Sequence, residues 1–353
     1  MNADTTWLLQ IPIPSTARDT DRRWHNILFD PWLAGSQSEV ASWFSRQWHG
    51  ITPALGSIAE VEELCREVEE ISSGSRRSDF LTATTSSSSS TPSSTSITSS
   101  TSITSSSSTL SSTSTSTSTF TSTSISPEPT FIDTIAISHE FTDHCHQSTL
   151  LECSPSTSVI ASANAAALIK GWKHFDRVEI TPTFFGDWRE TAGGATPSWL
   201  SINWLQTKWD ALYYHSAVMV AWEQHIGDLG TGEAEAVIYT PHGIHPATLT
   251  TVAKASPPIQ TLAFLHGLHD ISIGSQLNLG AHNGLAAQRL LGAKYWIGTH
   301  DEVKKGGGLV SWFLKRKVYT VQEALEKAKE QGDGGEVDAR FMDLKNGETA
   351  VLA

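Results

Sequence analysis

The sequence predicts a mixed α/β fold that one long low-complexity insertion interrupts. Short apolar segments typical of strands alternate along the chain with segments that carry the helical period. Such segments stand on both sides of a tract, residues 82–126, that consists almost entirely of serine and threonine. We therefore expect one domain built from residues 1–81 and 127–353, with residues 82–126 as a disordered insertion.

The expected strands are short, and several of them run directly into polar residues. Apolar and β-branched residues dominate each one, and turn-forming residues bound most of them. The expected strands are 6–11, 25–29, 131–138, 158–161, 177–181, 211–222, 236–240, 259–265 and 295–298.

Four segments predict helices. Residues 57–71 place apolar side chains at helical spacing, and residues 164–172 and 277–293 do the same. The last helix is expected from Thr320 to about residue 331. It begins with Thr320 and has Glu323 three positions later, which is the pattern of a capping box.

The serine and threonine tract contains too little apolar surface to offset the entropy lost on ordering, so we expect disorder. A phosphorylated regulatory linker is one interpretation, and O-glycosylation in a secretory setting is another. Expansion of a surface loop is the preferred one, because loop length costs little free energy.

Deleting residues 84–124 is therefore expected to leave one cooperative thermal transition close to that of the full chain. Folded segments flank the tract on both sides, and the tract itself adds no packing. Circular dichroism melting of the deletion variant tests this expectation, and complete aggregation of that variant would contradict it.

Charge and composition limit the partners. The net charge of −13 argues against nucleic acid, whose phosphates bind basic surfaces. A small-molecule substrate is expected instead, and an anionic one would need a local positive charge such as a metal ion. Three cysteines fit a reducing compartment, and neither a signal peptide nor a transmembrane segment is indicated, so a cytoplasmic location is expected.

A polar motif follows the expected strand 131–138 and reads Ser-His-Glu-Phe-Thr-Asp-His from Ser138 to His144. A tight turn after a strand can direct several side chains into one pocket, and imidazole and carboxylate groups are the usual ligands of hydrolytic zinc. A polar turn that satisfies its own hydrogen bonds is the alternative. Metal binding by His139, Asp143 and His144 is the preferred interpretation.

This motif resembles the His-x-His-x-Asp-His signature of the metallo-β-lactamase superfamily. Three further histidines follow in the family's order: His215 at its third histidine motif, His242 at its bridging aspartate and His300 at its final histidine. Residues 28–33 resemble the opening of the branch that contains ascorbate-phosphate lactonase-like and N-acylphosphatidylethanolamine phospholipase D-like hydrolases. The resemblance spans residues of about 5–315 outside the tract, and it implies a four-layer αββα sandwich.

Two positions depart from the family pattern. The resemblance implies one metal at His139, Phe141 and His215 and a second metal at Asp143, His144 and His300. Phenylalanine cannot bind a metal, and the neutral imidazole of His242 is a poor bridge between two cations. We therefore expect zinc as the cofactor, with one ion rather than two. The implied metal ligands are His139, Asp143, His144, His215, His242 and His300.

Two functions remain open at this point. The first is a metal-dependent hydrolase of an ester, lactone or phosphodiester, in which zinc held by Asp143, His144 and His300, with or without His242, activates water. Asp143 would accept the proton of that water, as the resemblance implies, and His215 would bind or orient the substrate. The alternative is a degenerate, non-catalytic binding protein of the same fold, which the Phe141 departure suggests.

Other residues have weaker functional interpretations. Asp30 is expected to orient a ligand histidine or its loop. Cys145 is either an additional soft ligand or, preferably, a small buried residue. His266 and His269 could line the same face, and Lys304 could meet an anionic substrate, although an exposed surface lysine is preferred.

Overall fold

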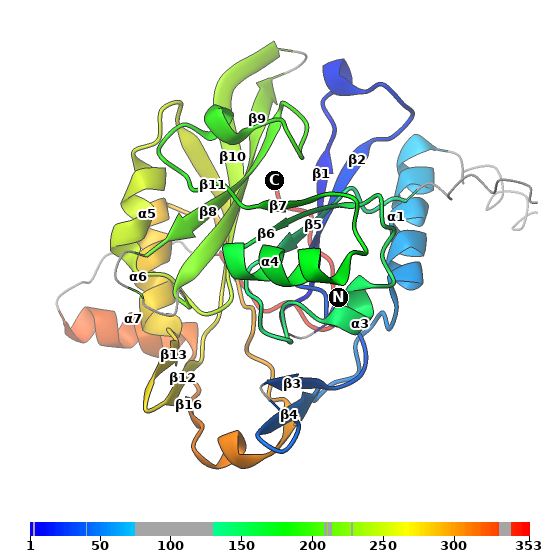
Figure 1. Ribbon diagram of the computed structural model, residues 1–353. Helices are drawn as coiled ribbons and strands as arrows, with labels where there is room; N and C mark the ends of the chain where they lie inside the picture. Colours follow the sequence, from blue (N-terminus) through cyan, green and yellow to red (C-terminus); the bar gives the residue numbers. More distant parts are fainter. Residues whose placement is uncertain are drawn as a thin grey trace, which may run out of the picture. The chain divides into compact units, whose positions relative to one another are not determined.

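The computed structural model describes residues 1–2, 4–39, 41–74, 130–207, 210, 214–226, 229–331 and 340–353. Residues Met1–Ser73 and Thr130–Ala353 belong to one compact unit, which has a mixed α/β fold (Figure 1). The second unit, Gly74–Pro129, lies outside the described residues except for Gly74, and it contains the expected insertion at 82–126.

The first large sheet has the strand order β1-β2-β5-β6-β7. Strand β1 (Trp7–Pro12) is antiparallel to β2 (Trp24–Phe29), and the following strands run parallel to β2. They are β5 (Thr134–Ile137), β6 (Ser158–Ala161) and β7 (Val178–Ile180). Because four strands run in the same direction, the residues that follow them emerge along one edge of this sheet.

The second large sheet has the order β17-β14-β11-β10-β9-β8. Its first four strands are parallel, whereas β9 and β8 are added in antiparallel pairs. Their bounds are β8 (Leu200–Gln206), β9 (Ser216–Ile226), β10 (Leu229–Thr240), β11 (Ile259–His266), β14 (Tyr295–Ile297) and β17 (Arg340–Met342).

Two small sheets and several helices complete the described unit. The small sheets have the orders β13-β12-β16 and β15-β4-β3. Their strands are β3 (Gln37–Glu39), β4 (Ser45–Trp48), β12 (Asp270–Ile273), β13 (Ser275–Asn278), β15 (Lys305–Gly307) and β16 (Lys315–Lys317). The α-helices are α1 (Ile58–Ser73), α3 (Gln147–Leu150), α4 (Ala163–Trp172), α5 (Pro246–Ala253), α6 (Ala281–Leu291) and α7 (Val321–Glu330). The 3-10 helices are η1 (Ser15–Ala17), η2 (Trp188–Thr191) and η3 (Leu309–Trp312).

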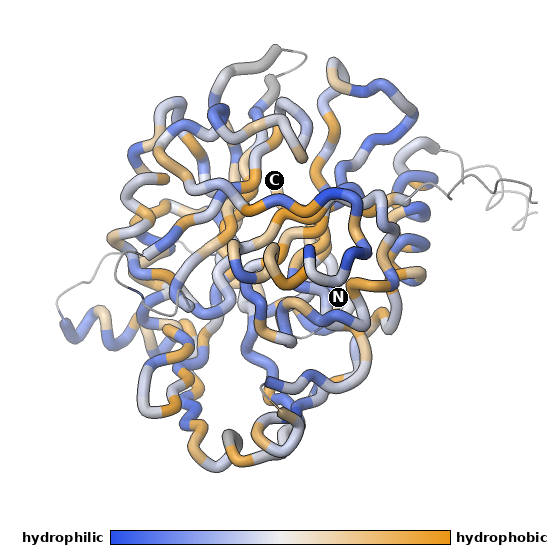
Figure 2. Tube along the Cα trace, in the orientation of Figure 1, coloured by the Kyte–Doolittle hydropathy of each residue, from blue (hydrophilic) through white to orange (hydrophobic). Residues whose placement is uncertain are grey.

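Three clusters of buried apolar side chains hold these elements together. One contains residues of both large sheets, such as Phe29 and Tyr239, which contact each other with ring centroids 5.3 Å apart. A second joins Ile135 of the first sheet to α1 and α4, and a third joins Phe264 of the second sheet to α5 and α6. In Figure 2 the strands of the two large sheets carry many hydrophobic residues, as expected for strands buried on both faces.

Most predicted elements are present, with informative differences at their ends. The capping box at the start of α7 is confirmed, because the Thr320 side chain accepts from the Glu323 backbone and Glu323 bonds back. The helix expected from residue 277 begins only at Ala281, since Asn278 still belongs to β13. Strand β8 was not predicted, because the polar Ser201 and Asn203 are fully buried in it.

No helix in the described part of the chain is long and apolar enough to cross a lipid bilayer. The longest described helix, α1, has 16 residues and alternates apolar with charged side chains.

Candidate metal centre

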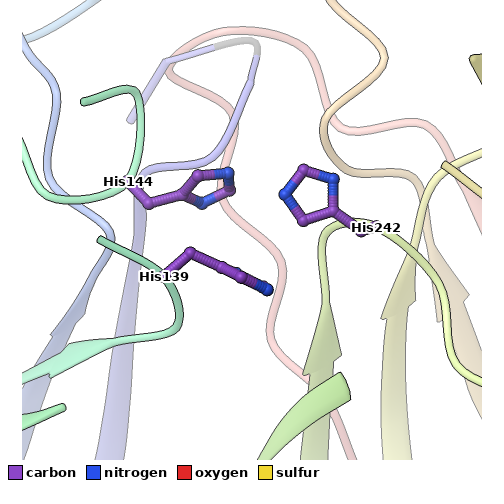
Figure 3. Close-up of side chains that lie close together, drawn as sticks. All are labelled: His139, His144 and His242. Carbon is purple, nitrogen blue, oxygen red and sulfur yellow. The ribbon is translucent and has the colours of Figure 1, made fainter. Parts of the chain in front are cut away.

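Three loops that follow strands of the two large sheets supply the candidate ligands. The loop after β5 carries His139, Asp143 and His144, and the residues after β10 and β14 supply His242 and His300. Figure 3 shows the rings of His139 and His144 on one side of the site and the ring of His242 facing them from the other side. The site therefore needs both sheets, since neither sheet alone supplies all of these side chains.

Two overlapping groups could each hold a metal ion. The ligand atoms of His139, His144 and His242 all lie within 4.8 Å of one another, and the three residues are buried. The ligand atoms of Asp143, His144 and His300 meet the same limit. His144 belongs to both groups, so the two groups are adjacent parts of one site.

Hydrogen bonds fix the orientation of three of these imidazoles. In each ring Nδ1 faces an oxygen atom of a buried side chain, which leaves Nε2 directed away from that partner. The pairs are His144 with Asp30 at 2.7 Å, His242 with Asn278 at 3.0 Å and His300 with Asp4 at 2.9 Å.

The free ends of two rings fit a metal ion. Among the described residues, Nε2 of His144 and Nε2 of His242 are buried and have no hydrogen-bond partner. An unpaired buried nitrogen costs free energy, and a metal ion would satisfy both atoms at once. The residues present therefore fit a zinc ion with imidazole ligands.

Asp30 connects His144 to the two large sheets through hydrogen bonds. Its Oδ1 accepts from the Ser138 backbone at 2.7 Å, and its Oδ2 accepts from the Tyr239 hydroxyl at 2.7 Å besides facing His144. The residue has a φ of 39°, which non-glycine residues adopt at a cost. His300 has a φ of 57°, so strained backbone occurs at two positions of the same site.

Replacing Asp30 by asparagine is expected to lower zinc affinity by about 10- to 100-fold, the usual cost of losing a carboxylate behind a ligand imidazole. Competition with a chromophoric chelator measures the affinity. Tyr239→Phe is the matched control, because it removes one hydrogen bond to Asp30 but leaves the carboxylate beside His144. Equal zinc affinity in Asp30→Asn and the parent would show that Asp30 does not support a ligand.

Lys304 lies beside the second ligand group, where it pairs with Asp143. Its ammonium lies 2.6 Å from Asp143 Oδ2 and 2.8 Å from Asp4 Oδ2, and only 8% of its side chain is exposed. Burial alone lowers the pKa of Lys304, but Asp143 and Asp4 outweigh burial and raise the pKa above its ordinary value. The interpretation of Lys304 as an exposed surface lysine is therefore wrong, whereas the adjacent Lys305 is exposed.

Electrostatics favour a neutral His242 and an ionised Asp143, whereas Asp143 and Asp30 outweigh burial and raise the pKa of His144. Burial lowers the pKa of His242, and the neighbouring histidines lower it further, to well below the ordinary value. Burial raises the pKa of Asp143, but Lys304 and His144 outweigh burial and hold that pKa well below its ordinary value. A neutral imidazole and an ionised carboxylate are the protonation states that bind metals.

His215 lies apart from both groups of ligand atoms. Its Nδ1 is 3.3 Å from Asp210 Oδ2, and its ring packs against His245 with centroids 5.4 Å apart. Like His144 and His242, it has a buried Nε2 with no hydrogen-bond partner among the described residues. The structure thus brings together His139, Asp143, His144, His242 and His300, but not His215.

Phe141 fills space beside the histidines. Its ring stacks on Tyr214 at 5.1 Å and lies nearly parallel to the ring of His139 at 5.7 Å. Tyr214 in turn contacts His242 edge-on at 5.5 Å. Phe141 and Tyr214 thus form an aromatic wall beside His139 and His242.

The other candidates have partners elsewhere. His266 bonds to Asn283 at 2.8 Å, and His269 accepts from Arg316 at 2.8 Å. Cys145 is a buried free cysteine, and burial raises the pKa of its thiol, so it is not poised to bind a metal.

Sequence reasoning missed two groups that orient ligands. Asp4 precedes the first strand, and Asn278 ends β13, and neither position carries a motif. Of the three residues that orient a candidate ligand, only Asp30 could be found from the sequence, because it directly follows the strand β2.

No family model matches this sequence, and no curated protein matches it. Solved structures to which the chain is distantly similar include the isothiocyanate hydrolase from Delia radicum gut bacteria, with 14% identity and a TM-score of 0.40 over 63% of this chain and 77% of that chain. A possible metal-dependent hydrolase from Veillonella parvula DSM 2008 has 10% identity and a TM-score of 0.48 over 99% and 98%. Igni18, a metallo hydrolase from Ignicoccus hospitalis, has 13% identity and a TM-score of 0.35 over 62% and 78%.

Proposed function

We propose that this protein is a zinc-dependent hydrolase with the four-layer αββα arrangement of the metallo-β-lactamase superfamily. In this proposal residues 82–126 are an insertion within the single domain, and the protein acts in the cytoplasm. One observation carries the proposal of a zinc-dependent activity. Buried imidazoles from loops of both large sheets converge, and in His144 and His242 a hydrogen bond fixes Nδ1 while Nε2 has no partner among the described residues.

We assign one zinc ion to His139, His144 and His242 rather than to the set expected from the sequence, Asp143, His144 and His300. These three residues offer imidazole nitrogens without a competing cation, whereas Asp143 in the other group already pairs with the Lys304 ammonium. Three protein ligands leave a coordination position open, as catalytic zinc sites require. The lysine thus takes the place of a second metal ion in this assignment.

When bound, zinc lowers the pKa of water and polarises the oxygen of an ester, lactone or phosphodiester. The protein's own residues supply the rest. Asp143 is ionised, and its Oδ1 lies 3.7 Å from His144 Nε2, so it can accept a proton at the ligand cluster. Lys304 neutralises Asp143 and keeps that carboxylate from leaving the site. His215 is assigned to substrate positioning, because Asp210 fixes its ring.

The test is zinc content and turnover of the purified chain. About one zinc per chain is expected after purification without added metal, and removing it with a chelator should abolish hydrolysis of bis(4-nitrophenyl) phosphate or 4-nitrophenyl acetate. Readdition of zinc should restore turnover. Protein that binds zinc but hydrolyses neither probe would favour the second candidate, a non-catalytic binding protein, for which the Phe141 stack is the specific observation.

A further inference from the structure

A cavity of about 190 Å³ opens beside the histidine cluster. It lies along the same edge of the first sheet, because Ser162 follows β6 and Thr181 follows β7, just as His139 follows β5. Trp204 of β8 forms part of its wall and contacts the His139 ring edge-on at 6.2 Å. The cavity therefore adjoins the proposed metal centre.

The inner wall of the cavity contains two hydroxyl groups without partners. Ser162 and Thr181 are 4% and 5% exposed, and neither Oγ atom has a hydrogen-bond partner among the described residues. Ser162 precedes α4, yet its side chain makes no capping bond. A buried hydroxyl without a partner is costly, so two of them in one cavity indicate a ligand that supplies hydrogen bonds.

The rim adds further polar groups and a flat apolar wall. Thr183 and Gln206 are exposed at the mouth, and Ile180 lies there with 55% of its surface exposed. The indole of Trp204 offers a flat face or edge to a planar group. Thr183 and Trp204 are also joined by a backbone bridge, which fixes the wall between the two sheets.

Charge decides between a neutral and an anionic ligand. Among the described residues, no lysine, arginine or histidine lines the cavity. The first turn of α4 contributes only a helix dipole, which offsets a small part of the free energy that burying an unpaired anion costs. Glu140 also accepts from Asn164 of the rim at 3.1 Å and adds a negative charge nearby. A neutral group is therefore favoured over the anionic alternative.

We propose that this cavity binds a neutral, planar carbonyl or carboxamide group of the substrate, which places the adjoining scissile bond at the histidine cluster. The identification of the ligand as part of a substrate rests on the proposed hydrolase function, but the cavity itself does not depend on the metal. Ser162 and Thr181 would donate to the carbonyl oxygen, and Gln206 would complete the contacts from the rim.

The test uses benzamide and acetamide as neutral probes and benzoate as the isosteric anion. Binding to the full chain is measured from the indole NMR signal of Trp204, assigned with Trp204→Phe. Saturable amide binding with at least about tenfold weaker benzoate binding is expected from the desolvation cost of an anion. No saturable binding of either amide, or equal binding of benzoate, would overturn the proposal.

Two variants test the hydroxyl groups. Ser162→Ala and Thr181→Val should each weaken benzamide binding by about fivefold, the equivalent of one hydrogen bond. Each should also raise the melting temperature of the ligand-free protein, because an unpaired buried hydroxyl is removed. The matched control is Thr261→Val on β11, which removes another buried unpartnered hydroxyl outside the cavity and should leave benzamide binding unchanged.

The outcomes separate this inference from the proposed function. Each titration is run on metal-free and on zinc-loaded protein. Zinc binding without amide binding overturns the cavity assignment alone. Amide binding without zinc binding supports the cavity and overturns the hydrolase proposal. Lower melting temperatures in both hydroxyl variants, with unchanged benzamide affinity, would show that the hydroxyls are structural and would overturn their assignment as ligand donors.

Discussion

Lys304→Met is expected to raise bound zinc from about one to about two ions per chain, because a second metal can replace the lost positive charge between two carboxylates. In the parent the ammonium pairs with Asp143 and Asp4, whose side chains are 14% and 0% exposed. Methionine retains the length of the side chain but leaves the carboxylates without a cation. Asp143, His144 and His300 then become available as a second ligand group.

The same variant should be strongly destabilised when metal is absent. Removing one partner from a buried ion pair costs about 3–5 kcal/mol, because the remaining charge stays buried. Added zinc should recover much of that loss, since binding to the folded state alone stabilises it. Metal analysis and thermal melting with and without zinc measure both effects.

Lys305→Met is the matched control, because the neighbouring Lys305 is exposed. It should change neither zinc content nor melting temperature beyond a few tenths of a kcal/mol. A Lys304→Met protein that folds and still binds about one zinc, with no recovery of stability on zinc addition, would show that the lysine does not stand in for a second cation.

His242→Ala is expected to remove zinc from the parent site, with a loss of affinity larger than the roughly 10- to 100-fold cost of a lost supporting residue. His300→Ala should keep the ion, because His300 belongs to the group in which Asp143 already pairs with Lys304. His144→Ala should lose the ion under either assignment, since His144 belongs to both groups. Chelator competition on the three purified variants measures these affinities.

The exposed His245 provides a control substitution, His245→Ala, that should leave zinc affinity unchanged. The reverse pattern, with zinc lost in His300→Ala and kept in His242→Ala, would move the ion to the group of Asp143, His144 and His300. Full zinc content in all three ligand variants would contradict both sites and would favour the non-catalytic binding protein.

Much of the architecture followed from local sequence. The strand before His139 and the helix at α7 were predictable because their signals lie within one segment: an apolar run in the first case and the Thr320 capping box in the second. Strand β8 could not be predicted from its local sequence. Its buried Ser201 and Asn203 bond to each other at 2.9 Å, so polar residues occupy positions that usually indicate an exposed face.

The environment of Lys304 shows where sequence reasoning ends. Two adjacent lysines before three glycines are typical of an exposed loop, and that expectation fits Lys305. Lys304 instead reaches Asp143, which lies 161 positions earlier in the chain. Nothing local distinguishes the two lysines, because the distinction depends on which side chain faces the interior of the folded unit.

The sequence by itself determined the mixed α/β class and the loops that carry candidate imidazole and carboxylate ligands, because strand periodicity and motif spacing are local properties. Only the tertiary structure decided which nitrogen atoms converge. Asp4 holds His300 across 296 positions of sequence, and Asn278 holds His242 across 36. The tertiary structure also placed His215 beside Asp210 and away from the cluster. Ring orientation depends on such distant hydrogen bonds, and these exist only after both sheets have packed together.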